Sequence, residues 1–260
     1  MDRQGEDYTS VTEIAGDDVS REQVARLCNR YFWAGGYCSQ KDVLEVACGT
    51  GQGLGYLSGI AQSIEAGDYS RGIVELARSH YQGRIPIHQF DAQKMPFENS
   101  SKDVIILFEA IYYLPDPEKF LKECIRVLRD EGTILVATAN KDLYDFNPSP
   151  KSHEYFGVPE LSAVFDKYDL DVRFYGDTPV ERTSLRQRLV RPVKRTVVRF
   201  GLMPKSMAGK KRLKRLVFGS LVKMPSEIDK STSPYIPPAE ISASVPDRKH
   251  KVILCAARMK

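Results

Sequence analysis

Short apolar runs alternate with amphipathic segments through the middle of the chain. Runs such as 42–47 and 103–108 are apolar on both faces, which is typical of strands buried in a parallel sheet. The intervening segments 70–81 and 117–128 carry apolar residues at helical spacing. Repeated strand and helix units of this length predict an α/β fold with right-handed crossovers and helices on both faces of a mostly parallel sheet. The expected strands are 42–47, 63–66, 85–90, 103–108, 133–138, 170–175 and 251–258, and the expected helices 54–62, 70–81, 117–128 and 159–167.

The first 40 residues predict a polar lead-in followed by one helix. Ser20 is the expected N-cap, and Val24, Leu27 and Tyr31 recur at helical spacing. The Gly35-Gly36 pair is expected to end this helix.

About seventy residues separate the last two expected strands. Residues 176–248 are too many for a plain hairpin loop and predict an inserted subdomain or lid. Within them, 185–200 and 210–222 are basic amphipathic segments, and Pro192 interrupts the first.

The charge is unevenly distributed. Fourteen lysines and arginines and no acidic residue lie between Arg182 and Ser226, a segment that we call the basic block. The net charge of the chain is +4, so the rest carries −10. A basic block on an acidic body indicates the kind of partner rather than the fold.

Composition narrows the class of protein. Hydrophobic residues make up 42% and charged residues 28%, as in ordinary globular proteins. No apolar run approaches the roughly 20 residues that cross a bilayer, and the polar N-terminus lacks the apolar core of a secretory signal. The five scattered cysteines show no metal-ligand spacing and indicate reduced, buried thiols. We therefore expect a cytoplasmic protein without a metal site.

A glycine-rich turn follows the first parallel strand. A strand that ends in such a turn and opens a helix places a ligand at the carboxyl edge of the sheet. The dinucleotide fingerprint requires glycines at positions one, three and six. Counted from Gly49 the sixth position is Leu54, and counted from Gly51 it is Tyr56, so a nicotinamide or flavin domain is excluded.

Residues 40–140 instead resemble the motif set of the class I S-adenosylmethionine-dependent methyltransferases. VLEVACGTGQG resembles their first motif, with Ala47 where many members have glycine; EAGDYS, FDAQKMPF and DVIILFEAIYYL resemble the next three. RVLRDEGTILVAT resembles the segment that leads into the fifth strand. The resemblance implies S-adenosylmethionine as cofactor, with Asp68 on the ribose hydroxyls, Asp91 on the adenine amino group, Ala92 against the ring, and Phe108 and Glu109 near the methionine. The implied cofactor-binding residues are Glu45, Ala47, Cys48, Gly49, Gly51, Asp68, Tyr69, Asp91, Ala92, Phe108 and Glu109, with Tyr31 and Trp33 either covering the cofactor or packing in the core.

The resemblance also implies the architecture. The family has a Rossmann-like sheet of seven strands whose last strand is antiparallel and inserted before the sixth. We therefore expect a cofactor-covering N-terminal segment at 1–40, an α/β core at 41–175, the basic insertion at 176–248 and the final core strand at 249–260.

Methyl transfer from a sulfonium needs alignment and, for a hydroxyl or ammonium acceptor, a general base. Candidate catalytic residues near the carboxyl edge are Glu109, Tyr113 and His153. A basic lid favours a small-molecule or glycan acceptor that carries negative charge. Contact with an anionic membrane or a lipid-linked substrate is the alternative use of the amphipathic segments.

Two other functions remain as alternatives. An RNA methyltransferase would use the basic block to bind phosphates, but the acidic body argues against it. The NPSP sequence at 147–150 follows the fifth strand, whereas the motif of base amino-group methyltransferases follows the fourth, so nucleic acid is disfavoured. A non-catalytic S-adenosylmethionine-binding protein is the second alternative, and the intact Asp68 and Asp91 argue against it.

Overall fold

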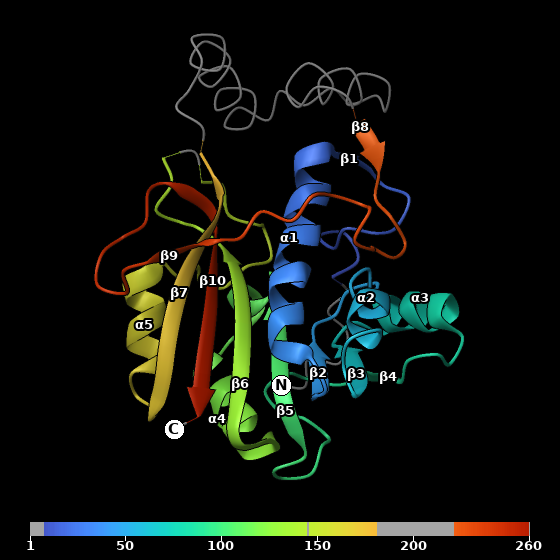
Figure 1. The fold of residues 1–260 in the computed structure, drawn as a ribbon, viewed down its shortest axis with the longest axis horizontal. Coiled ribbons are helices and arrows are strands. Elements are labelled where there is room, and N and C mark those ends of the chain that lie inside the picture. Colours follow the sequence, from blue (N-terminus) through green and yellow to red (C-terminus); the bar gives the residue numbers. More distant parts are fainter. Residues whose placement is uncertain (1–7, 145, 181–220, 260) are drawn as a thin grey trace.

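The protein is an α/β domain built on one mixed sheet of eight strands, seen in a computed structural model (Figure 1). The structure describes residues 8–144, 146–180 and 221–259. The strand order is β4-β3-β2-β5-β6-β10-β7-β9. The strands are β2 (Asp42–Val46), β3 (Ser63–Asp68), β4 (Ile87–Gln89), β5 (Lys102–Phe108), β6 (Leu128–Ala139), β7 (Leu170–Pro179), β9 (Ala239–Ile241) and β10 (His250–Met259).

The expected alternation of strands and helices is confirmed, with shifted ends. The helices are α1 (Arg21–Cys38), α2 (Leu54–Ser58), α3 (Arg71–Tyr81), α4 (Pro117–Val127) and α5 (Val158–Phe165), with a 3-10 turn η1 (Ile111–Tyr113) after β5. Helix α2 is shorter than predicted, since a turn at Gly59 precedes β3.

Strand pairing confirms the antiparallel last strand. Strands β2 to β6 pair in parallel, whereas β10 lies antiparallel between β6 and β7. The eighth strand, β9, is an addition to the predicted seven: it pairs antiparallel with β7 through Phe174 and Ile241. It comes from the segment that the sequence assigned to the insertion.

Two hydrophobic layers cover the two faces of the sheet. Helices α1, α2 and α3 pack on one face, where Val43, Ile106 and Leu135 are buried. Helices α4 and α5 pack on the other face, against Leu44, Ile105 and Val136. Successive residues of each central strand point to opposite layers, so a strand apolar throughout is buried on both sides.

Helix α1 begins as predicted but ends later. Ser20 and Gln23 form a capping box, because the Ser20 hydroxyl accepts from the Gln23 amide while the Gln23 side chain accepts from the Ser20 amide. The prediction that Gly35-Gly36 ends the helix is wrong, since α1 continues to Cys38. A Cβ at Gly35 would lie 2.9 Å from the Tyr56 hydroxyl. Glycine here allows close packing of α1 on α2.

The described part of the expected insertion lies along the core domain. Strand β8 (Leu221–Lys223) pairs with β1 (Asp18–Ser20) just before α1. We call residues 224–238, which follow β8, the strap, because they pass across α1 toward β9 (Figure 1). The Ile236 amide donates to Asn29 Oδ1 at 2.9 Å on the way. The predicted segment 185–200 and residues 210–220 of the second lie outside the described residues, and Leu221 and Val222 belong to β8.

None of the helices in the described ranges is long and apolar enough to cross a membrane. All five cysteines are buried and free.

Candidate functional site

A cavity of about 1280 Å³ opens at the carboxyl edge of the parallel strands. One side is formed by the residues that follow β2, β3, β4 and β5, and the other by α1 and residues 8–13. This is the edge at which open α/β sheets bind ligands. The cavity brings together Tyr31, Glu45, Ala47, Cys48, Gly49, Asp68, Tyr69, Asp91, Ala92, Phe108, Glu109 and Tyr113 of the residues predicted from the sequence.

The loop after β2 is built from residues with left-handed backbone. Ala47 has φ +54°, Gly49 +59° and Gly51 +84°. The Tyr81 hydroxyl donates to the Gly51 carbonyl at 2.6 Å and accepts from the Gly55 amide, which fixes the loop against α3. Gly51 thus shapes the loop and is not itself part of the cavity wall.

Asp68 joins the second motif to the first. It ends β3, and its carboxylate accepts from the Ser70 amide at 2.9 Å and the Gly49 amide at 3.1 Å. Burial raises the pKa of this carboxyl, and the backbone hydrogen bonds oppose the rise. A carboxylate fixed by backbone amides at the cavity wall fits the bidentate acceptance of two ribose hydroxyls.

Asp91 follows β4 and also lines the cavity. Its Oδ1 accepts from the Gln93 amide at 2.8 Å, and Ala92 beside it is buried. The neighbouring Phe90 ring lies over Gly67, where a Cβ would be 2.1 Å from the ring. Glycine at 67 therefore lets β3 and β4 bring the two acidic residues to one wall.

Glu45 lies at the floor of the cavity on β2. Its Oε1 accepts from the Tyr31 hydroxyl at 2.5 Å, and its Oε2 is buried without a hydrogen-bond partner among the described residues. Burial raises the pKa of Glu45 to about 7, although the Tyr31 hydrogen bond and Arg30 oppose the rise. The orphaned oxygen is an acceptor for a cationic or N–H group of a ligand.

Glu109 follows β5 with a left-handed backbone, φ +53°. Its Oε2 accepts from the Tyr112 hydroxyl at 3.1 Å, and its Oε1 lies 3.6 Å from Arg30 Nη1. Backbone strain of this kind is often retained at functional sites. Tyr113, on η1, donates to Ser149 Oγ at 2.9 Å, and its ring packs against that of Tyr8.

Besides Gly51, two predicted residues lie apart from the cavity wall. The His153 side chain is exposed, and its backbone amide donates to the Tyr112 carbonyl at 2.7 Å. Trp33 is buried in the core against Tyr37, Phe108 and Tyr175, whereas Tyr31, two residues earlier, faces the cavity.

The sequence predicted a covering segment at 1–40 but did not single out the polar residues within it that line the cavity. Residues 8–13 line it, and the Glu13 carbonyl accepts from Gln52 Nε2 at 2.8 Å. Arg26 and Arg30 line it from α1. Their spacing of four residues places them on one helix face, the only sequence signal they carry.

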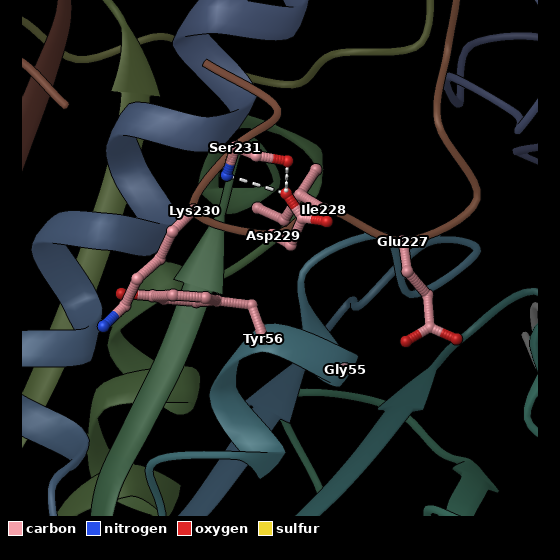
Figure 2. A pocket seen from close by; sticks show the side chains of 7 residues that line it. All are labelled: Gly55, Tyr56, Glu227, Ile228, Asp229, Lys230 and Ser231. Carbon is pink, nitrogen blue, oxygen red and sulfur yellow. Dashed lines mark hydrogen bonds between the residues drawn. The ribbon is translucent and has the colours of Figure 1, made fainter. Parts of the chain in front are cut away.

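A second, more open pocket of about 610 Å³ lies between α2 and the strap (Figure 2). Tyr56 and residues 227–231 of the strap line it. The Asp229 carboxylate accepts from the amide and hydroxyl of Ser231, and Glu227 binds His80 at 2.8 Å and also Arg84. These acidic groups are satisfied within the fold, which indicates an anchor for the strap rather than a reactive site.

Comparison with known proteins identifies a domain in the central part of the chain. The model of the methyltransferase-domain family matches residues 44–136. A probable S-adenosylmethionine-dependent methyltransferase of Mycobacterium tuberculosis is 36% identical over 104 residues, which cover 40% of this chain and 38% of that protein. The chain thus matches less than two fifths of that relative's length.

Two longer matches extend beyond the conserved motifs. The O-methyltransferase cnsE of Penicillium expansum is 28% identical over 83% of this chain and 76% of its own length. The fold is similar to that of a SAM-dependent methyltransferase from Thermotoga maritima, with a TM-score of 0.58, 16% identity and 92% of each chain covered. By its motifs, strand order and relatives, the chain contains a methyltransferase domain at residues 44–136 and is similar to the class I S-adenosylmethionine-dependent methyltransferases, whose cofactor is S-adenosylmethionine.

Proposed function

We propose that the protein transfers the methyl group of S-adenosylmethionine to an oxygen or nitrogen atom of a small-molecule or glycan acceptor. The observation that carries this proposal is one continuous cavity wall that holds Asp68, Asp91, Glu45 and Glu109 at the ends of neighbouring strands. The relative cnsE is an O-methyltransferase, and this similarity supports an oxygen atom as the methyl acceptor.

The residues present fit the cofactor. Asp68 would accept from the ribose hydroxyls, and Asp91 and Ala92 would hold the adenine, since these residues line the wall beside β3 and β4. A Cβ added to Gly49 would meet only the Thr12 methyl, at 3.5 Å, so a ligand can lie against this backbone. The orphaned Glu45 Oε2 would accept from the methionine ammonium. When bound, the cofactor supplies a methyl group already activated by a positive sulfur.

The β5 side of the cavity suits the acceptor. Glu109 is the general base that we propose, because its carboxylate is fixed by Tyr112 and Arg30 at the tip of β5. Tyr113 would position the acceptor through its hydroxyl or ring. His153 lies outside the wall, and we give it no role in proton transfer.

The cover assists by excluding water. Tyr8 packs edge-on against Tyr69, on the β3 side, and against Tyr113, on the β5 side. Residues 8–13 therefore span both halves of the cavity. Enclosing the reactants removes competing water and keeps them aligned for in-line displacement, which accounts for about 7–11 kcal/mol of a barrier in favourable cases.

We also propose that the acceptor is anionic and that the basic block, with its residues 182–220 outside the described ranges, contributes to its attraction. The charge pattern of the sequence, +14 against −10, supports this part of the proposal.

Calorimetric titration of the full chain with S-adenosylmethionine and S-adenosylhomocysteine tests the cofactor. We expect micromolar binding by the wild type and at least a tenfold weaker affinity for Asp68→Ala. Asp171→Ala, which removes an exposed carboxylate on β7, is the matched control and should bind like the wild type. Absence of binding by the wild type, or equal loss in both variants, would contradict the proposal.

A further inference from the structure

Two arginines of α1 face the cavity without completed hydrogen bonding. Arg26 and Arg30 lie one turn apart and both line the cavity. The Nε atoms of both are buried, and no acceptor among the described residues lies within hydrogen-bond reach of either. Buried guanidinium donors are normally paired, because leaving them unpaired is costly. The pair is therefore equipped to bind an additional acceptor group.

The acidic neighbours do not satisfy these arginines. The Glu22 carboxylate is 4.0 Å from Arg26 Nε and instead accepts from Lys251 Nζ at 2.6 Å with both oxygens. Glu13 Oε1 accepts from the Gln23 side chain at 2.8 Å.

Glu109 and Glu45 are the remaining acidic neighbours of Arg30, and neither forms a hydrogen bond with it. The distance from Arg30 Nη1 to Glu109 Oε1 is 3.6 Å, longer than a hydrogen bond, while Glu109 Oε2 accepts from Tyr112. Glu45 accepts from the Tyr31 hydroxyl through Oε1, and its Oε2 makes no hydrogen bond with Arg30 or with any other described residue.

The position of the pair favours the acceptor over the cofactor. Gly49, Asp68, Asp91 and Ala92, proposed to hold the cofactor, follow β2, β3 and β4, and Glu45, proposed for the methionine ammonium, lies on β2. Arg30 instead lies beside Glu109, at the tip of β5, and β5 is on the other side of β2 in the sheet. Arg26 is one turn nearer the N-terminus of α1, where residues 8–13 cover the cavity. Arg30 therefore faces the half of the cavity that holds the proposed base, and Arg26 lines the cavity one turn away.

We propose that Arg26 and Arg30 form a binding site for a carboxylate or phosphate group of the methyl acceptor. A planar guanidinium fork offers two parallel donors to such a group, and charge-assisted hydrogen bonds in a water-poor cavity are about twice as strong as neutral ones. This inference rests on the proposed function and assigns the anionic part of the acceptor to named residues. It also places that anion beside Glu109, so that the acceptor is held at two points during transfer.

Inorganic phosphate and benzoate serve as probes for the anion site. Each is titrated into the full chain saturated with S-adenosylhomocysteine, at constant ionic strength kept with chloride. We expect millimolar binding of at least one probe by the wild type and at least tenfold weaker binding by Arg26→Gln and by Arg30→Gln. Arg30→Lys keeps the positive charge but loses the planar fork of donors, so its affinity for the probe should lie between those of the wild type and Arg30→Gln. Arg258→Gln, which alters an exposed pair with Glu131, is the control and should match the wild type.

A second titration separates the acceptor from the cofactor as the source of the anion. The affinities of S-adenosylhomocysteine and of 5'-methylthioadenosine, which lacks the amino-acid part, are compared in each variant. Unchanged affinity for both agrees with an acceptor site. Tenfold loss for S-adenosylhomocysteine alone would assign the arginines to the cofactor carboxylate and overturn the inference.

The two proposals can fail separately. No probe binding by the wild type, or probe binding insensitive to the arginine substitutions, would overturn the anion site while leaving cofactor binding intact. Failure of the wild type to bind S-adenosylhomocysteine would instead contradict the proposed function, and probe binding would then be measured on the protein alone. Thermal melts of each variant show whether a loss reflects the site or the fold.

Discussion

At the scale of single residues, the motif that identifies the family contains a strained alanine. Ala47 adopts φ +54°, a conformation that costs an L-residue about 1–2 kcal/mol. This explains physically why glycine is common at that position of the family. Glu109 carries the same strain at the tip of β5. Both strained residues line the cavity, where the requirements of ligand binding, rather than stability, determine the backbone conformation.

Replacing Ala47 with glycine should therefore leave stability nearly unchanged. Relief of the left-handed strain offsets the greater freedom of glycine in the unfolded chain, each term being about 1 kcal/mol. In Ala77→Gly, within α3 and fully buried, no strain is relieved, and we expect a loss of at least about 1 kcal/mol. Urea denaturation of both variants measures the difference. Equal losses would show that Ala47 is not strained.

The buried Glu45 should make stability depend on pH. Its pKa rises from 4.5 in the unfolded chain to about 7 in the fold, so folding favours the protonated form. The wild type therefore loses stability as pH rises from about 4.5 to 7, and Glu45→Gln does not share this loss. We expect the free energy of unfolding of Glu45→Gln, relative to wild type, to increase by about 2 kcal/mol between pH 5 and pH 8.

Denaturation at both pH values, without cofactor, measures this change. Glu75→Gln, on the exposed side of α3, is a control for removing a carboxylate that is not buried. A pH-independent difference between Glu45→Gln and wild type would contradict the assignment of the titration to Glu45.

At the scale of elements, α1 shows where sequence reasoning succeeds and where it fails. Ser20 as the expected N-cap and the apolar spacing at Val24, Leu27 and Tyr31 predicted the start and the buried face of the helix. Gly35-Gly36 suggested an end, because glycine weakens isolated helices. The tertiary contact of Gly35 with Tyr56 overrides that preference. Local propensity does not report contacts with a helix twenty residues further on.

The two glycines should respond differently to alanine. A Cβ at Gly36, which is exposed, would meet nothing within 4 Å, so Gly36→Ala should stabilise the fold by about 0.5–1 kcal/mol through helix propensity. A Cβ at Gly35 would lie 2.9 Å from the Tyr56 hydroxyl and 3.2 Å from Ile60 Cδ1, which cancels that gain. Thermal denaturation of the two variants side by side tests this. Equal stabilisation would mean that the α1–α2 contact does not require glycine.

At the scale of the whole molecule, the core and the cavity wall could be predicted because they depend on periodicity and on motifs at strand ends. Asp68 and Asp91 were expected there and lie there. Within the expected covering segment 1–40, the part played by residues 8–13 could not be predicted, nor could the path of the strap, since both depend on single long-range contacts. The hydrogen bond from Gln52 to Glu13 and that from Ile236 to Asn29 follow from no repeating pattern.

Glu227 and the adjacent Ile228 join the strap to the end of α3 and to the loop that follows β2. Its carboxylate binds Arg84 and His80, and the adjacent Ile228 amide donates to the Gln52 carbonyl at 2.9 Å. The hydrogen bond with Arg84 lowers the pKa of Glu227 below 4.5, with a further contribution from His80. A lowered pKa adds stability that is fully present above about pH 4.5 and is lost as pH falls through the folded value.

Glu227→Gln should therefore destabilise the protein by about 1 kcal/mol at pH 7, the upper range for a partly exposed ion pair, and by progressively less below pH 4.5. The Ile228 amide should also exchange its hydrogen faster, because the strap opens locally before the core does. Glu131→Gln breaks the exposed pair with Arg258 and should leave both quantities close to wild type. Because Gln52 also binds the cover at Glu13, loosening the strap should reach the cavity as well, and weaker S-adenosylhomocysteine binding would accompany faster exchange. Faster exchange with unchanged binding would limit the strap to a structural role.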